Sequence, residues 1–289
     1  MVSTRIKTYG ELVMFSHTLF SVPFGLSAML LAAQGLPSPR VFLWVMVALV
    51  SARTAANALN RLVDRKIDAK NPRTAGRHLP AGKVSLKEVI FLIAFCLLAL
   101  TAAAFMLNPL CVILLPVPLF LFFIYSFTKR FTWTCHLVLG IACGGAPVGA
   151  WLAVTGGIGL PSLVMGAAVM FWVAGFDIIY GAQDEAFDRE ENLSSIPVEF
   201  GIPRALQISS VFHVLAVLLL ACLVPLAGLG PAYWSGLAIT AGLLFYEHKM
   251  VSPGHLENVK LASYSINQIV SIILLLSVIV DVLLRTGPK

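Results

Sequence analysis

Long apolar runs with almost no charge recur from one end of this sequence to the other. Hydrophobic residues make up 58% of its 289 residues, and only 12% are charged, which is about half the charged fraction of an ordinary soluble domain. The mean hydropathy is +0.89. Apolar runs of about 20 residues match the length that an α-helix needs to cross a bilayer. We therefore expect an all-α integral membrane protein in which residues 1–289 form a single transmembrane domain.

Nine membrane spans can be drawn on these runs. They cover about residues 12–33, 41–60, 86–106, 109–127, 136–155, 162–182, 205–225, 231–247 and 263–284. Short turns rich in Gly and Pro follow the odd-numbered spans, and longer polar connections follow the even-numbered ones. This pattern predicts nine transmembrane helices around a central cavity that opens to the cytoplasmic side.

The net charge of +6 follows membrane topology rather than nucleic-acid binding. If the N-terminus lies in the cytoplasm, sixteen of the twenty Lys and Arg residues fall on the cytoplasmic side and three on the other. Cytoplasmic loops carry such an excess of positive charge. We expect the lipid bilayer and no nucleic acid as a partner, and an inner or cytoplasmic membrane location with the active site facing the cytoplasm. The five cysteines show no metal-type spacing and are predicted to be buried thiols.

Polar residues gather in a stretch that begins inside the second span. If the helix continues past that span, five of them share one stripe at steps of three and four residues. They are Arg53, Asn57, Asn60, Asp64 and Asp68. Ionisable residues are costly in a membrane span and usually face a polar cavity. The stripe is therefore a candidate functional site.

A second acidic stretch follows the sixth span. Asp184-x-x-x-Asp188 repeats the spacing of Asp64-x-x-x-Asp68 after 120 residues. Asp177 precedes Asp184 by about two helical turns and is expected within the span. Internal repeats in membrane proteins commonly place a site at their shared interface. The two aspartate pairs are therefore predicted to face each other.

Four carboxylates at two helix ends would repel one another without a cation. Mg²⁺ prefers oxygen ligands and commonly binds a few carboxylates together with substrate phosphates. The pairs Asp64/Asp68 and Asp184/Asp188 are thus predicted to bind Mg²⁺ and a diphosphate, whose departure they would assist. The candidates for direct phosphate contact are Arg53, Arg73, Arg77 and Lys129. If an allylic carbocation forms, the rings of Tyr125 and Tyr180 are candidates to stabilise it.

Taken together, these motifs resemble the UbiA superfamily of intramembrane prenyltransferases over nearly the whole chain. The first motif reads N-R-L-V-D-R-K-I-D from Asn60 to Asp68, and the second reads D-E-A-F-D from Asp184 to Asp188. The segment from Tyr125 to Arg130 is similar to the family's Y-x-x-x-K-R element. Arg53 and Arg77 lie where the family places arginines. Within the family, the sequence of the first motif is most similar to that of the 4-hydroxybenzoate polyprenyltransferase-like subgroup.

The resemblance implies Mg²⁺-dependent transfer of a polyprenyl group from its diphosphate to a hydroxylated aromatic acid in ubiquinone or menaquinone biosynthesis. The acceptor would be 4-hydroxybenzoate or a dihydroxynaphthoate, with Arg53 a candidate partner for its carboxylate. One departure from the family is Arg61, which stands where an aspartate usually follows the asparagine. We expect Arg61 to point about 100° away from Asn60, off the acidic stripe, so that metal binding is preserved.

Several alternatives remain open at this stage. Asp177 is a candidate secondary metal ligand, acceptor contact or proton acceptor, and the tyrosines are equally candidates for an interfacial aromatic belt. Arg130 is interpreted as an interface anchor, and His136 as structural or interfacial. A secondary transporter is a competing function, and so is a family member with a macrocyclic acceptor of the haem O or chlorophyll type. A CDP-alcohol phosphotransferase would need a motif that the chain does not contain.

Overall fold

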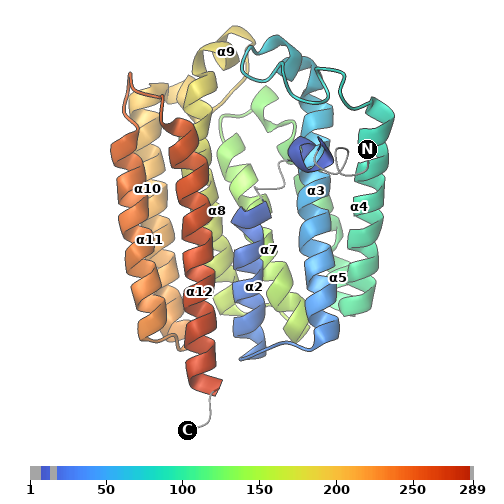
Figure 1. The fold of residues 1–289 in the computed structure, drawn as a ribbon, viewed down its shortest axis with the longest axis vertical. Helices are drawn as coiled ribbons and strands as arrows, with labels where there is room; N and C mark the ends of the chain where they lie inside the picture. The colour runs from blue at the N-terminus through green and yellow to red at the C-terminus, as the bar shows by residue number, and fades with distance from the viewer. Residues whose placement is uncertain (1–7, 14–17, 287–289) are drawn as a thin grey trace.

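The computed structural model describes residues 8–13 and 18–286, and these residues are almost entirely helical (Figure 1). The long helices are α2 (Thr18–Ala33), α3 (Pro39–Lys70), α4 (Leu86–Leu107), α7 (Cys135–Thr155), α8 (Leu160–Gly181), α10 (Ile196–Ala227), α11 (Pro231–Met250) and α12 (Asn267–Thr286). The shorter ones are α5 (Pro109–Leu114), α6 (Pro116–Tyr125), α9 (Glu185–Glu190) and the single turns η2 (Thr128–Arg130), η3 (Ala182–Asp184) and η4 (Leu261–Ile266).

Six helices in the described part of the chain are long and apolar enough to cross a membrane. They cover Pro39–Lys70, Leu86–Leu107, Cys135–Thr155, Leu160–Glu190, Ile196–Ala227 and Leu261–Arg285, and two shorter apolar helices cover Phe20–Ala33 and Pro109–Tyr125. The prediction of an all-helical membrane protein is confirmed. The ninth predicted span coincides with η4 and α12, and the eighth with α11, which is not among the six. Residues 14–17 of the first predicted span lie outside the described residues.

The second predicted span continues well beyond residue 60, as the acidic stripe required. Ser38 caps α3 by accepting a hydrogen bond from the Val41 amide, and the helix then runs for 32 residues to Lys70. At about 1.5 Å per residue its length is about 48 Å, which exceeds the roughly 30 Å of a hydrocarbon layer. The last turns, with Asp64 and Asp68, therefore extend to one end of the bundle. Asn71 ends the helix in an extended conformation.

Two predicted spans differ from the helices found. The fourth is divided into α5 and α6, because Pro116 begins a new helix at a position where its missing N–H breaks the hydrogen-bond ladder. The seventh begins earlier than residue 205, since Ser195 caps α10 at Ile196. A break at Gly201, whose φ of 76° suits glycine, separates this first turn from the rest of α10.

Helix α8 lies at the centre of the bundle and packs against both α7 and α10. Its approach to α7 depends on small residues, because Gly144 and Gly166 bring the two backbones into direct contact. Trp172 and Phe176 of α8 pack with Phe20 of α2 in the main apolar core. This packing fixes the helix that leads into the second aspartate motif.

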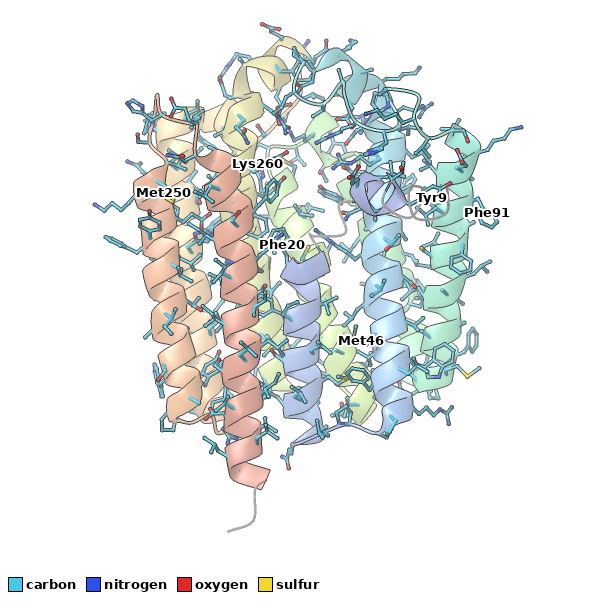
Figure 2. All side chains as sticks on the ribbon, in the orientation of Figure 1. Tyr9, Phe20, Met46, Phe91, Met250 and Lys260 are labelled. Carbon is cyan, nitrogen blue, oxygen red and sulfur yellow. The ribbon has the colours of Figure 1, made fainter. Side chains whose placement is uncertain are left out.

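Polar and charged side chains are concentrated at one end of the molecule. The connection after α3, the turn η3 and helix α9 lie together at the upper end in Figure 1, opposite the C-terminus. Figure 2 shows nitrogen- and oxygen-bearing side chains gathered at that end, whereas carbon dominates along the helices below it. The two aspartate motifs are thus carried to the same end of the bundle.

Candidate active site

A polar cavity of about 190 Å³ lies at this upper end and is enclosed by both aspartate motifs. Every residue that the sequence singled out for the site lines it: Arg53, Asn57, Asn60, Asp64, Asp68, Arg73, Arg77, Tyr125, Lys129, Asp177, Tyr180, Asp184 and Asp188. Helix α3 supplies the first motif, and α8, η3 and α9 supply the second. Segments more than a hundred residues apart therefore meet around one space. The catalytic and binding roles of these residues remain predictions.

Each of the four motif aspartates is paired with a basic side chain. Arg130 Nη2 lies 2.8 Å from Asp64 Oδ1, and Arg77 Nη1 lies 2.5 Å from Asp68 Oδ1. In the second motif, Lys129 Nζ lies 2.7 Å from Asp188 Oδ2, and Arg73 pairs with both oxygens of Asp184. The cavity therefore holds opposite charges in close balance, so the aspartates need no metal to offset their mutual repulsion in this arrangement.

Arg73 and Asn71 connect the first motif to the second. Arg73 Nε donates to Asp184 Oδ1 over 2.8 Å, and its other nitrogens bond Asp184 Oδ2 and the Tyr180 hydroxyl. Asn71 Nδ2 donates to the same Asp184 oxygen over 3.0 Å. The guanidinium also lies over the Tyr180 ring, 4.8 Å from its centroid. These contacts join the end of α3 to η3 across the mouth of the cavity.

Two cations outside the membrane-spanning helices stay charged. Burial lowers the pKa of Arg73, but its hydrogen bonds to Asp184 and Tyr180 outweigh that effect and raise the pKa overall. Burial likewise opposes the charge on Lys129, while the charge of Asp188 and the hydrogen bond to it raise the Lys129 pKa above its ordinary value. Both side chains are therefore available as cations to bind an anionic group.

The expectation that Arg61 lies off the acidic stripe was wrong. Its Nη1 atom lies 3.8 Å from Asp68 Oδ2, and the side chain lines the polar cavity. Seven residues separate Arg61 from Asp68, and at about 100° per residue this is only about 20° short of two full turns. Arg61 thus shares a face with Asp68, although it points away from Asn60. The cavity contains a guanidinium where the family pattern has a carboxylate.

The interpretation of two other residues also needs correction. Arg130 is bonded to Asp64 and to the Ser126 and Val63 carbonyls, and it contributes to the cavity instead of serving only as an interface anchor. His136 lies in the cavity wall, where its Nδ1 atom is 2.7 Å from Asp177 Oδ2. Its position a few residues after Lys129 and Arg130 is a sequence signal that could have placed it near the site.

Tyr264 also lines the cavity and was not predicted. Its ring lies 4.9 Å from that of Tyr180 between centroids. It belongs to the π-helical turn η4, and Asn267 at the start of α12 donates through Nδ2 to the Ala262 carbonyl of that turn over 3.1 Å. A π-turn shifts the helical register, so periodicity counted along this segment does not reveal which side chain enters the site.

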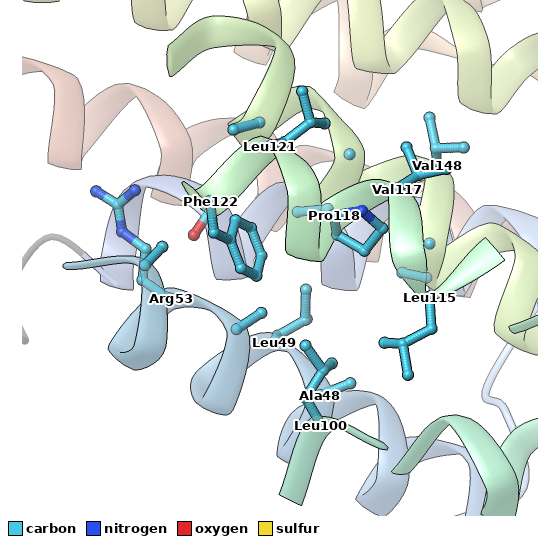
Figure 3. Close-up of a pocket in the computed structure, with 18 of the residues that line it drawn as sticks. Ala48, Leu49, Arg53, Leu100, Leu115, Val117, Pro118, Leu121, Phe122 and Val148 are labelled. Carbon is cyan, nitrogen blue, oxygen red and sulfur yellow. The ribbon is translucent and has the colours of Figure 1, made fainter. Parts of the chain in front are cut away.

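An apolar chamber of about 390 Å³ adjoins the polar cavity. It lies among α3, α4, α5, α6 and α7, and Figure 3 shows Arg53 at one end of it and Leu115 toward the other. Arg53, Tyr125, Leu139 and Cys143 line both spaces. Arg53 Nη1 lies 3.4 Å from Cys143 Sγ, and its buried Nε has no hydrogen-bond partner. The polar cavity and the apolar chamber therefore lie side by side and share part of their walls.

The donor set suits a cation that binds together with an anion. Among the described residues, no three His, Cys, Asp or Glu side chains are arranged to hold a metal ion by themselves. Two aspartate pairs nevertheless face one cavity, and Asp68 Oδ2 lacks a hydrogen-bond partner. Mg²⁺ usually takes one or two carboxylates and completes its shell with water and phosphate oxygens. The residues present fit that mode of binding.

The family model of the UbiA prenyltransferase family matches residues 21–269. The chain belongs to the UbiA prenyltransferase family. It is accordingly a prenyltransferase, as the resemblance of its motifs to that family implied.

Other members of the UbiA family support this assignment over most of their length. The 4-hydroxybenzoate octaprenyltransferase of Vibrio cholerae is 32% identical over 256 residues, which are 87% of this chain and 89% of the relative. A UbiA homolog from Aeropyrum pernix K1 has a solved apo structure with a TM-score of 0.83 and 35% identity, covering 92% of this chain and 98% of that one. The solved structure of a UbiA homolog from Archaeoglobus fulgidus, bound to DMAPP and Mg²⁺, shares the fold with a TM-score of 0.64. Its sequence is 18% identical, and the match covers 92% of this chain and 99% of that one.

Proposed function

We propose that this protein transfers a polyprenyl group from polyprenyl diphosphate to a hydroxylated aromatic acid, 4-hydroxybenzoate or a dihydroxynaphthoate, in quinone biosynthesis. The observation that carries the proposal is the junction of two spaces. A cavity lined by carboxylates and cations opens directly beside an apolar chamber. A prenyl diphosphate has an anionic head and a hydrocarbon tail, and this junction suits both. The names of the Vibrio relatives favour 4-hydroxybenzoate as acceptor.

The diphosphate is proposed to bind among Arg73, Arg77 and Lys129. In the structure these cations are paired with Asp184, Asp68 and Asp188, respectively. Charge-assisted hydrogen bonds to phosphate oxygens are strong enough to compete with such pairs. On binding, the cations would turn partly from the aspartates to the phosphates and leave carboxylate oxygens available for a metal.

Mg²⁺ is the proposed cofactor, with Asp64, Asp68, Asp184 and Asp188 as the residues that would hold it. When bound, Mg²⁺ neutralises charge on the diphosphate and makes it a better leaving group. Asn60 Nδ2 donates to Asp64 Oδ2 over 2.8 Å, so we propose that Asn60 orients this carboxylate.

The reacting carbon is proposed to lie where the two spaces meet. Tyr125 lines both of them, and Tyr180 stands beside the second motif. Their ring faces would stabilise the allylic cation that remains after the diphosphate leaves. Arg53 would bind the carboxylate of the acceptor, because its Nε atom is buried without a hydrogen-bond partner and favours an anionic ligand. The aromatic ring of the acceptor then attacks the allylic cation through the carbon ortho to the acceptor's hydroxyl group. That ring carbon afterwards loses its proton.

The prenyl tail is proposed to occupy the apolar chamber and to continue between helices into the bilayer. Gly145 and Gly149 line that chamber, and a Cβ atom at either position would meet no other atom within 4 Å. These glycines keep the space open for the tail. The lining includes little that could bond a polar substrate.

The membrane arrangement is part of the same proposal. We propose that residues 1–289 form one domain with nine transmembrane helices, counting α5 with α6, and that the N-terminus and the cavity mouth face the cytoplasm. The excess of Lys and Arg in the connections at the cavity end supports this orientation. A polyprenyl diphosphate would then present its head at the inner face of the membrane.

The experiment that tests the function is product identification. Purified protein in lipid vesicles is incubated with a labelled polyprenyl diphosphate, Mg²⁺, and either 4-hydroxybenzoate or dihydroxynaphthoates, and the lipid extract is analysed by mass spectrometry. The expected product has the mass of the acceptor plus the prenyl group. The proposal is contradicted if no aromatic acid in the panel is prenylated while the diphosphate is bound.

A further inference from the structure

Asp177 differs from the four motif aspartates in its partner. Each motif aspartate is paired with an arginine or lysine, whereas Asp177 is bonded to His136. We propose that Asp177 is the catalytic base that removes the ring proton after prenyl transfer, and that His136 is the residue that positions its carboxylate. The proposal deepens the prenyl transfer proposed above and rests on it.

The pairing leaves part of Asp177 open to the cavity. His136 Nδ1 lies 2.7 Å from Asp177 Oδ2, and the Asp177 side chain is still 27% exposed. The His136 side chain, in contrast, is 1% exposed. One carboxylate oxygen is thus fixed by the histidine, and the other is left for a substrate proton. A cavity-facing carboxylate oxygen that no protein group occupies can accept a proton from a bound substrate.

The surroundings of His136 fix its ring and favour one tautomer. A Cβ atom at Gly181 would lie 3.0 Å from His136 Cε1, which is tighter than an ordinary contact, so the glycine gives the imidazole room. The buried Nε2 atom has no hydrogen-bond partner. A ring that carries a proton on Nδ1 donates to Asp177 through that atom. We infer this tautomer from the contacts.

The depth of Asp177 places it at the reacting carbon and away from the phosphates. Asp177 lies in α8 and precedes Asp184, in the following turn η3, by seven residues, which at about 1.5 Å per residue is about 10 Å along the chain axis. Asp177 lines the polar cavity together with Arg53 and Tyr125, the residues at the junction with the apolar chamber. A diphosphate at Asp184 and Asp188 directs its allylic carbon toward this junction.

The step balances without any further reactant. The diphosphate has left with the electron pair of its C–O bond, and the ring uses one π pair to form the new C–C bond. The C–H bond at the same ring carbon then breaks, and its electron pair restores aromaticity. The proton passes to the free oxygen of Asp177, which becomes a neutral carboxyl group while His136 keeps its hydrogen bond to the other oxygen.

The test separates proton removal from ionisation of the diphosphate. Asp177→Asn preserves the shape and still accepts a hydrogen bond from His136, but it cannot take up the ring proton. Three quantities are measured for wild type and variant: diphosphate release, prenylated product, and free prenol formed when water captures the cation. The acceptor is used both unlabelled and deuterated at the ring positions ortho to its hydroxyl group.

We expect Asp177→Asn to lower product formation by about a hundredfold or more, in line with the usual contribution of a general base. Diphosphate release should fall less than product, the share of prenol should rise, and a primary deuterium isotope effect should appear that the wild type lacks. His136→Phe should change these readouts in the same direction, and His136→Asn, which keeps a donor, should partly restore them. A parallel loss of release and product without an isotope effect in Asp177→Asn would overturn the proposal.

A matched control uses another buried carboxylate. Asp281 lies near the C-terminal end of α12 and accepts a hydrogen bond from the Gly230 amide. The Asp281→Asn variant should keep the wild-type ratio of prenol to product. If the wild-type protein prenylates no aromatic acid, the proposed function fails, and this inference fails with it. If the wild type prenylates and Asp177→Asn does so equally well, only the inference fails.

Discussion

Replacing Arg73 tests how the two aspartate motifs are joined across the cavity. Arg73 bonds both oxygens of Asp184 and also the Tyr180 hydroxyl. A hydrogen bond to a charged group contributes about 1.5–3 kcal/mol, so losing the two bonds to Asp184 removes about 3–6 kcal/mol of interaction. The lower value is the better guide, because the Arg73 side chain is 29% exposed and Asn71 still bonds Asp184.

In the proposed complex Arg73 makes charged hydrogen bonds of similar size to the diphosphate, so we expect Arg73→Ala to lower kcat/KM for the prenyl diphosphate by about a hundredfold, which corresponds to about 3 kcal/mol. Arg73→Lys keeps the charge but loses the two-pronged geometry, and its loss should be about tenfold. The assay is the initial rate of Mg²⁺-dependent prenylation in vesicles over a range of diphosphate concentrations, with thermal unfolding followed in parallel.

Arg65 provides the matched control for this prediction. It lies in the last turns of α3, eight residues before Arg73, but its Nη1 atom donates to the Leu62 carbonyl, 2.8 Å away. Arg65→Ala should stay within about twofold of the wild type, as expected of a surface substitution. The reasoning is refuted if Arg73→Ala retains wild-type activity, or if Arg65→Ala loses as much as Arg73→Ala.

Three further substitutions test other parts of the site. Gly149→Phe should fill part of the apolar chamber, so that competition between short and long prenyl diphosphates shifts toward the shorter one while KM for the acceptor is unchanged. Arg61→Ala should weaken inorganic diphosphate binding about tenfold, the size of one charged contact, measured by calorimetry; unchanged affinity would exclude Arg61 from the anion site. Because the Lys129 pKa is raised, its pairing with Asp188 is fully present below the ordinary lysine pKa and is lost only above it. The stability difference between wild type and Lys129→Met, measured by thermal unfolding, should therefore be constant between about pH 6 and about pH 9.

Much of the site could be predicted from the sequence, because the positions of its residues follow helical periodicity. Asp64 and Asp68 share a face of α3 by spacing alone, and the repeat at Asp184 and Asp188 indicated the second half. The same arithmetic, applied over seven residues instead of one, would have placed Arg61 beside Asp68. That error came from comparing Arg61 only with Asn60.

Other features arise from tertiary contacts that no local pattern encodes. The pairing of His136 with Asp177 joins α7 to α8 through residues that are 41 positions apart in sequence. Tyr264 enters the cavity from a π-helical turn, where the register differs from that of an α-helix. Pro116 marks the break between α5 and α6. The apolar run continues through this proline, so the sequence predicted one span there. Periodicity therefore predicts which residues share a helix face, and not which faces meet.

The central claim is that both aspartate motifs bind one magnesium diphosphate, and a double-mutant cycle tests it most directly. The affinity of purified protein for a non-hydrolysable prenyl diphosphate analogue is measured with and without Mg²⁺ in wild type, Asp64→Ala, Asp184→Ala and the double variant. If one ligand is shared, each single substitution removes most of the Mg²⁺-dependent affinity, and the double substitution removes little more. Additive losses, or affinity that does not depend on Mg²⁺ in the wild type, would contradict the claim.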